Sequence, residues 1–337
     1  MIEAPYIGSL KAGPLGTIAD VAGVTVGHCT LDQRAVQTGV TVIRPHQGDV
    51  YRSKVPAAAS VINGFGKSIG LVQVDELGVL ETPIALTNTF GVGTVANAQI
   101  RHAIEANSSI GREWPTVNPL VFECNDGYLN DIQALAVQEA HFVRALQACG
   151  EEFERGSVGA GRGMSCFELK GGIGSASRVS DVAGRSFTTG ALVLANFGRL
   201  SMLTLGGVAL GRTLSAAEGH KAEKGSIIMI IATDAPLDAR QLRRLSMRAT
   251  AGLARTGSVY GHGSGDLSLA FTTAYTVPHL DDFIEVPALV SDSRLDPLFQ
   301  AAADSVEQAI VDALFSAVSV TGRDGHRRLS IKDITTS

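Results

Sequence analysis

The chain has 337 residues, a net charge of −5 and 45% hydrophobic residues. This length supplies one large domain or two ordinary ones with an ample core. The acidic balance argues against a nucleic-acid partner, because such proteins need an excess of Lys and Arg to neutralise phosphates. No apolar run reaches the roughly 18 residues of a membrane span, and the first residues lack the pattern of a signal peptide.

The four cysteines are widely spaced and form no CxxC pair; they are Cys29, Cys124, Cys149 and Cys166. Such spacing is atypical of zinc and redox sites and favours reduced thiols. We therefore expect a cytoplasmic protein without a membrane partner.

Short apolar runs bounded by Gly, Pro or Asn make the first 125 residues read as mostly β. They cover residues 23–31, 38–45, 57–64, 70–78, 82–88 and 118–125. Glycine, with 38 residues scattered along the chain, is typical of layered folds with many tight turns and close strand contacts.

Helical spacing of apolar residues predicts three helices. The first lies in residues 130–150, with Ile132, Leu135, Ala136, Ala140, Val143 and Leu146 as its stripe. The second opens at Pro236 and carries Leu242, Leu245, Ala249 and Leu253 on one face, and the third covers 296–318 around Val306, Ile310 and Leu314. Apolar runs at 190–198 and 226–236 predict buried central strands, so we expect a mixed α/β sandwich rather than alternating βαβ units.

Two glycine-rich stretches have weak cofactor signals. Gly91, Gly93 and Ala96 match a dinucleotide fingerprint, but no βαβ unit or acidic strand end is evident around them, which favours a plain turn. Residues 159–178 lack the Gly-Lys-Ser/Thr ending of a phosphate-binding loop and predict a β-hairpin. The histidines show no zinc spacing either, so we expect no cofactor and no metal.

Three polar spots each have two interpretations. Ser264 and Asp266 lie at the start of an apolar strand, where alternation points both side chains to one face. They could form a proton relay, or Asp266 could simply cap a turn. A second group of polar residues follows another strand and forms either part of a functional site or a polar turn that caps the next helix. Its members are Glu123, Asn125, Asp126, Tyr128 and Asn130. Gly225 and Ser226 precede a buried strand, so they form either an ordinary loop that enters the strand or a position where the serine serves chemistry. They follow a surface segment at 199–225 in which a chain break is tolerable.

Six blocks in one order, spread over nearly the whole chain, resemble the DmpA-like aminopeptidases. The blocks are DVAGVTVGH, VFECNDGYLND, GGIGSASR, LVLANFG, KGSIIMIIATDAPL and GSGDLSLAFTTA. That family includes L-aminopeptidase/D-esterases and β-peptidyl aminopeptidases. The resemblance implies an α+β fold, a four-layer αββα sandwich of the N-terminal-nucleophile type, forming one catalytic domain over residues 1–337.

The resemblance also implies self-cleavage between Gly225 and Ser226, giving an α chain of 1–225 and a β chain of 226–337. Ser226 would then be nucleophile and N-terminus, and its α-amine, with a pKa near 8, would serve as the base. Ser264 and Asp266 match residues that tune the nucleophile, Asn196 matches the oxyanion donor, and Glu123 matches the anchor of the substrate's amino group.

One departure from the family pattern is Asn125, which stands where family members carry a tyrosine that assists the oxyanion site. Asparagine can also donate but is shorter, and Tyr128 nearby is a candidate to compensate.

We therefore expect a self-processing serine aminopeptidase or amidase that acts on short peptides, amino-acid amides or esters and assembles as a homo-oligomer of αβ units. Two alternatives stay open: an acyltransferase like the ornithine acetyltransferases, which use threonine, and a binding homologue with impaired catalysis.

Overall fold

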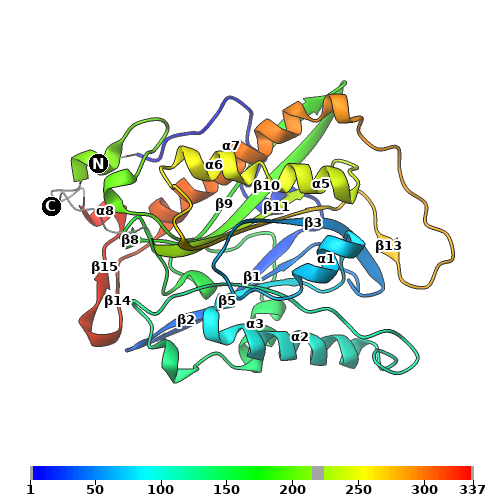
Figure 1. Cartoon of the computed structure of the whole chain (residues 1–337), viewed down its shortest axis with the longest axis horizontal. Helices are drawn as coiled ribbons and strands as arrows, with labels where there is room; N and C mark the ends of the chain where they lie inside the picture. The colour runs from blue at the N-terminus through cyan, green and yellow to red at the C-terminus, as the bar shows by residue number, and fades with distance from the viewer. Residues whose placement is uncertain (1–2, 215–223, 335–337) are drawn as a thin grey trace.

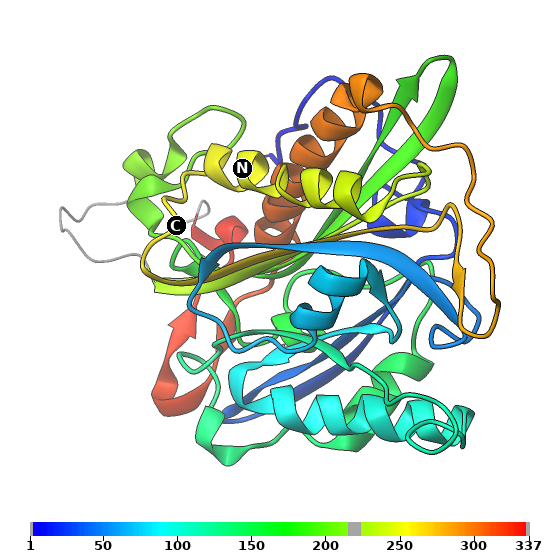
Figure 2. The same ribbon diagram turned by 45° about the vertical axis from the view of Figure 1, so that its right-hand side comes forward.

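The computed structural model describes residues 3–214 and 224–334. Two β-sheets are stacked face to face, and helices cover the outer face of each sheet (Figures 1 and 2). These four layers agree with the predicted αββα sandwich.

The first sheet has the strand order β1-β2-β5-β6. Its strands are β1 (Thr25–Gln33), β2 (Val36–Arg44), β5 (Ile84–Asn88) and β6 (Leu120–Cys124). β5 and β6 run parallel, whereas the other neighbours are antiparallel. The helices α2 (Val92–Ala106) and α3 (Glu139–Gln147) pack on this sheet and on each other, and they form the lower layer in Figure 1.

The second sheet has the order β13-β3-β12-β11-β10-β9, with β4 also paired to β3. Its strands are β3 (Ser53–Gly64), β4 (Val79–Leu80), β9 (Gly172–Val182), β10 (Arg185–Asn196), β11 (Lys224–Thr233), β12 (Gly263–Thr272) and β13 (Val277–Pro278). Only β11 and β12 form a parallel pair within it. The helices α5 (Ala239–Ser246), α6 (Ala249–Arg255) and α7 (Asp296–Ser316) cover its outer face.

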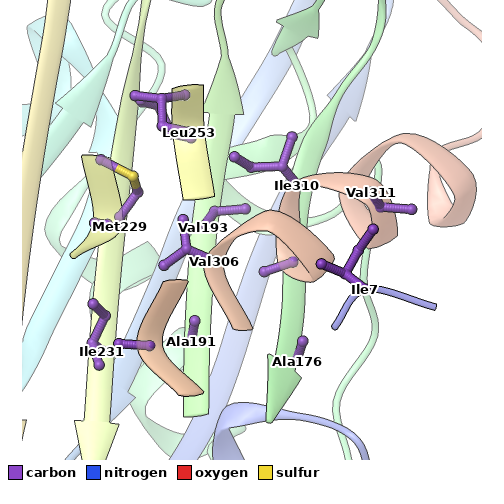
Figure 3. Packing of buried hydrophobic residues seen from close by; sticks show 14 of the residues in the cluster. Ile7, Ala176, Ala191, Val193, Met229, Ile231, Leu253, Val306, Ile310 and Val311 are labelled. Atoms are coloured by element: carbon purple, nitrogen blue, oxygen red, sulfur yellow. The ribbon is translucent and has the colours of Figure 1, made fainter. Parts of the chain in front are cut away.

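The apolar run of β11 is buried on both faces because it lies in the middle of the sandwich. Alternate side chains point to opposite faces of a strand. Ile227, Met229 and Ile231 therefore join the core under α5, α6 and α7, whereas Ile228 and Ile230 join the core between the sheets. Figure 3 shows Met229 and Ile231 beside Val193 of β10, facing Val306 of α7. The predicted buried central strand is confirmed.

The remaining elements are short. They comprise α1 (Leu71–Leu77), the hairpin of β7 (Ser165–Cys166) and β8 (Leu169–Lys170), α4 (Leu210–Leu214), the hairpin of β14 (Val320–Thr321) and β15 (Arg327–Arg328), and α8 (Ile331–Ile334). The hairpin predicted within residues 159–178 is confirmed as β7 and β8. The charged part of the predicted surface segment lies at 215–223, outside the described residues.

The two C-terminal helix predictions hold well. The predicted face of Leu242, Leu245, Ala249 and Leu253 is fully buried, although it is shared by two helices, α5 and α6, instead of one. In α7, Val306, Ile310 and Leu314 are buried as predicted.

The N-terminal predictions were wrong in three places. The predicted strand at 70–78 is α1, flanked by Gly70 and Gly78 in left-handed conformations, because its short alternation fits a helix equally well. The first predicted helix shrinks to α3: Leu135 has a φ of +47° and is exposed, and Phe142 rather than Val143 fills the core.

The glycine-rich stretch at 88–100 is also not a plain turn. It enters α2, and the parallel unit β5-α2-β6 is a βαβ unit that sequence reasoning missed. The side chain of Asn88 caps this entry by accepting a hydrogen bond from the Gly91 amide at 2.7 Å. A Cβ at Gly91 would lie 2.7 Å from the Thr87 hydroxyl, so the glycine serves close packing.

Among the described residues, every helix is too short or too polar to cross a membrane. The four cysteines are free thiols, and three of them are buried.

Candidate active site

A cavity of about 870 Å³ opens where β10 ends and β11 begins. Both sheets and the C-terminal hairpin contribute to its walls. Its lining residues include Phe65, Lys67, Thr89, Glu123, Asn125, Tyr128, Ser165, Glu168, Asn196, Arg199, Gly225, Ser226 and Arg328. Six of the eight residues predicted for the site thus line one cavity, and Ser264 and Asp266 lie directly beneath it in β12.

Ser226 lies near the start of β11, between two neighbouring strands. It faces Asn196 in the antiparallel pairing with β10 and Gly265 in the parallel pairing with β12. Its hydroxyl accepts a hydrogen bond from the Gly265 amide at 3.1 Å. The strand therefore holds this side chain in one place although it borders a cavity.

Gly225 occupies a backbone position that only glycine adopts without strain. Its φ is +123°, and a Cβ placed on it would lie 2.0 Å from the carbonyl oxygen of Asn196.

Asn196 ends β10 with its side-chain amide fixed at both atoms. Oδ1 accepts a hydrogen bond from the Ser165 amide at 2.8 Å, and Nδ2 donates to the Asn125 carbonyl at 2.9 Å. A primary amide has two N–H groups. The second N–H of Nδ2 is therefore available to a group bound near Ser226.

A buried lysine supports the hairpin that carries Ser165. The Lys170 ammonium donates to three carbonyls, those of Gly161, Met164 and Gly171, at 2.7 to 2.9 Å. Burial lowers the pKa of Lys170 well below its usual value. The bonds to Gly161 and Met164 tie β8 to the preceding loop and so fix the amide that orients Asn196.

Ser264 and Asp266 lie on one face of β12, as predicted. The Ser264 hydroxyl donates to the Asp266 carboxylate at 2.5 Å, and both residues are fully buried. They flank Gly265, the residue that faces Ser226 across the strand pair. A hydroxyl bonded to a carboxylate at this place can relay a proton.

Glu123 lies in β6 of the other sheet and reaches the same cavity. One carboxylate oxygen accepts the Lys67 amide at 2.7 Å, and the other accepts the Thr89 hydroxyl. Within residues 3–214 and 224–334 it forms no ion pair, although only 3% of its surface is exposed. A buried carboxylate of this kind favours a cationic partner.

The comparisons with known proteins agree with this site. The model of peptidase family S58 matches residues 16–328. The chain belongs to peptidase family S58. The relatives include the β-peptidyl aminopeptidase BapA of Sphingosinicella microcystinivorans, which is 36% identical over 354 aligned residues, covering 96% of this chain and 87% of the relative.

Two solved structures are also similar. The PH0078 protein of Pyrococcus horikoshii OT3 is 48% identical with a TM-score of 0.93, covering 98% of this chain and 95% of that one. The L-aminopeptidase D-Ala-esterase/amidase of Ochrobactrum anthropi, described as a serine aminopeptidase prototype with a variant Ntn hydrolase fold, is 35% identical with a TM-score of 0.89, covering 97% and 94%. The expected family, fold and enzyme class, a hydrolase of the aminopeptidase kind, are confirmed.

The departure at Asn125 has a local structural role in this S58 peptidase. Its side-chain oxygen accepts the Gly127 amide at 2.9 Å, which closes a turn, while its carbonyl holds Asn196. The turn caps no helix: α3 begins much later, after Gln138. The ring of Tyr128 is stacked against His326, with centroids 4.7 Å apart.

Asp126 and Asn130 hold this turn from below. The side-chain Nδ2 of Asn130 donates to the Asp126 carboxylate at 3.0 Å, and its Oδ1 accepts a hydrogen bond from the backbone N–H of Gln37 at 3.0 Å. Burial raises the pKa of Asp126 to about 6, against hydrogen bonds that favour the charged form.

Sequence reasoning missed several residues that line the site in this S58 peptidase, among them Lys67, Thr89, Ser165 and Arg328. Thr89 had a usable signal, because Thr87 pairs with Glu123 in the parallel strands β5 and β6, whose carboxyl ends meet at one edge. Lys67 and Ser165 contribute backbone amides, which any residue type supplies. Arg328 comes from a distant hairpin without a recognisable motif.

Proposed function

We propose that this S58 peptidase is a self-processing serine aminopeptidase or amidase that acts on short peptides, amino-acid amides or esters through an acyl-enzyme on Ser226. One observation carries the proposal: the Ser226 hydroxyl and the Asn196 side chain face each other across a strand pair at a cavity that also holds the carboxylate of Glu123, and the hydrogen-bonded Ser264–Asp266 pair flanks Gly265 in the adjoining strand.

Self-cleavage would begin with attack of the Ser226 hydroxyl on the Gly225 carbonyl carbon. A C–O bond forms, the C–N bond breaks, and the hydroxyl proton ends on the nitrogen of Ser226. Water then hydrolyses the ester and leaves Gly225 as a carboxylate and Ser226 as a free N-terminus. The positive φ and the lack of a Cβ at Gly225 support this step, because they leave the carbonyl approachable.

Peptide hydrolysis would follow the same path between molecules. The freed α-amine of Ser226 takes the hydroxyl proton, since its pKa near 8 is close to the operating pH. The second N–H of Asn196 stabilises the oxyanion, which is typically worth about 3 kcal/mol. Glu123 binds the substrate ammonium and so limits action to N-terminal residues. Ser264 and Asp266 carry the proton between the amine and the leaving group.

Two neighbours in the cavity complete this proposal. Asn125 and Tyr128 stand beside the oxyanion position, and we assign them to substrate binding. The names of relatives, β-peptidyl aminopeptidase and L-aminopeptidase D-Ala-esterase/amidase, support small amino-acyl substrates.

Mass spectrometry tests the self-cleavage. Purified wild type should yield two chains, the second beginning at Ser226, whereas Ser226→Ala should stay at full length. A wild type that remains a single chain of 35.1 kDa would refute the proposal. Cleavage that persists in Ser226→Ala would instead identify a contaminating protease.

A panel of aminoacyl p-nitroanilides and amides, including β-amino acids and D-alanine, then tests hydrolysis. Transfer of the acyl group to an added amino acid, measured beside release of the free acid, distinguishes the acyltransferase alternative. Match to a peptidase family favours hydrolysis.

We also propose a cytoplasmic homo-oligomer of αβ units. The free thiols support the location, and the family resemblance alone supports the assembly. Light scattering of the processed protein tests the assembly.

A further inference from the structure

The strand order of the second sheet gives the cavity two distinct ends on either side of Ser226. β12 lies on one side of β11, and β10 lies on the other. Glu123 belongs to the β12 end: a Cβ on Gly66 would lie 3.6 Å from its carboxylate and 3.8 Å from the Cα of Gly265. A substrate ammonium at Glu123 thus directs the rest of the substrate across Ser226 towards β10.

Arg328 lies at the opposite end, beyond Asn196. Its Nε donates to the Ser165 hydroxyl at 3.1 Å, and the Ser165 amide donates to Asn196. Its guanidinium stacks on the Tyr128 ring, with the central carbon 3.8 Å from the ring centroid. The series Ser226, Asn196, Ser165, Arg328 therefore leads from the nucleophile to a fixed cation.

The guanidinium of Arg328 retains binding capacity. In the part of the chain that the structure describes, its two terminal nitrogens form no hydrogen bond or ion pair, and the side chain lines the cavity. Stacking on Tyr128 and the bond to Ser165 fix the plane of the fork, which suits a carboxylate bound through two oxygens.

Two further charged side chains lie at this end. Glu168 and Arg199 also line it. Glu168 sits in the two-residue turn of the β7–β8 hairpin, where both Phe167 and Glu168 have positive φ. Its carboxylate accepts the Leu200 amide at 3.2 Å, which holds it by the backbone. The Glu168 carboxylate is thus engaged by the backbone, and the guanidinium of Arg328 is the group through which this end favours an anion.

We propose that Arg328 binds the free C-terminal carboxylate of the leaving amino acid, which makes dipeptides the preferred substrate class. The inference rests on the proposed function, because it takes Ser226 as the point of cleavage and Glu123 as the ammonium anchor. The two charged anchors at opposite ends then measure the length of a zwitterionic dipeptide, with its peptide bond above Ser226.

The experiment compares a dipeptide with its C-terminal amide. The aminoacyl group that the enzyme hydrolyses best is joined to alanine or to alaninamide, so the two substrates differ only in the terminal charge. Wild type should show kcat/KM about 10 to 100-fold higher for the acid, the range expected of a charged hydrogen-bonded contact. Arg328→Gln should bring the ratio close to one, and Arg328→Lys should keep part of it.

Arg327→Gln is the matched control, because it removes the same charge from the same strand at an exposed position. It should keep the wild-type ratio. Using a ratio cancels any effect of Arg328 on Asn196 through Ser165, since that effect would alter both substrates alike.

Equal kcat/KM of wild type for the acid and the amide would overturn the inference, even if Arg328→Gln failed to fold. Retention of the preference in Arg328→Gln would overturn it as well. Failure of the proposed function is distinguishable, because it would show as no self-cleavage and no hydrolysis of any substrate in the panel.

Discussion

Asn196 and Ser226 face each other across the antiparallel pairing of β10 and β11, at the point where one strand ends and the other begins. Strand pairing therefore fixes an amide donor beside a hydroxyl. The amide is oriented from its far side by Ser165 and Asn125.

Replacing Asn196 by alanine should lower kcat about 10²- to 10³-fold, because the oxyanion would lose its side-chain donor. KM for the same substrates should change much less. Asn196→Asp keeps an acceptor for the Ser165 amide but supplies no donor, so it should lose as much activity as alanine. Steady-state kinetics of the processed variants check this, and a kcat within a few-fold of wild type for either variant would exclude the assigned role.

Gly225→Ala should abolish or greatly slow self-cleavage. The new Cβ would lie 2.0 Å from the Asn196 carbonyl oxygen, and a φ of +123° is unfavourable for alanine by roughly 1–3 kcal/mol before the clash is counted. Gly93→Ala is the control, since no atom lies within 4 Å of its Cβ position. Gel electrophoresis over time measures both variants, and wild-type processing of Gly225→Ala would contradict the prediction.

Glu123→Gln should reduce kcat/KM for substrates with a free amino group about 10 to 100-fold, because a charged hydrogen bond is lost. Self-cleavage involves no substrate ammonium and should proceed normally. Thr89→Val removes one hydrogen bond from the same carboxylate and should have a smaller effect. If Glu123→Gln impaired processing and catalysis equally, Glu123 would be a structural residue instead of an amine anchor.

Asp126→Asn should flatten the pH dependence of stability between about pH 4 and 6. Burial raises the pKa of Asp126 from 3.8 to about 6 in the folded protein, so folding favours the protonated acid. The resulting contribution of Asp126 to the free energy of unfolding is about 3 kcal/mol. It is fully present below pH 4 and is lost as the pH rises through 6. Denaturant unfolding of the processed proteins at pH 4.5 and 7 measures the difference.

The free energy of unfolding should change less between the two pH values in Asp126→Asn than in wild type. An asparagine oxygen still accepts the Asn130 amide, so the turn should keep its hydrogen bond. An identical pH dependence in both proteins would show that Asp126 keeps an ordinary pKa.

Local patterns predicted the elements whose residues are buried on a clear period. Residues 226–236 predicted a buried strand, and Val306, Ile310 and Leu314 predicted the buried stripe of α7; both are confirmed. Short or mixed patterns failed, as at 70–78, where one buried residue, Val74, does not distinguish a strand from a helix. Gly91 and Gly93 concealed the start of α2; Gly91 is required there for close packing against Thr87.

By itself, the sequence determined that Ser264 and Asp266 share a face, which follows from strand periodicity. It also determined that Ser226 lies near the start of a central strand, which follows from the apolar run after it. Its motifs indicated a family, and the resemblance to that family assigned functional roles to Asn196 and Glu123. Only the tertiary structure brought Glu123 of one sheet and Arg328 of the C-terminal hairpin to opposite ends of one cavity. That arrangement depends on how the two sheets stack and where β15 folds back, and these long-range contacts leave no periodic trace in the chain.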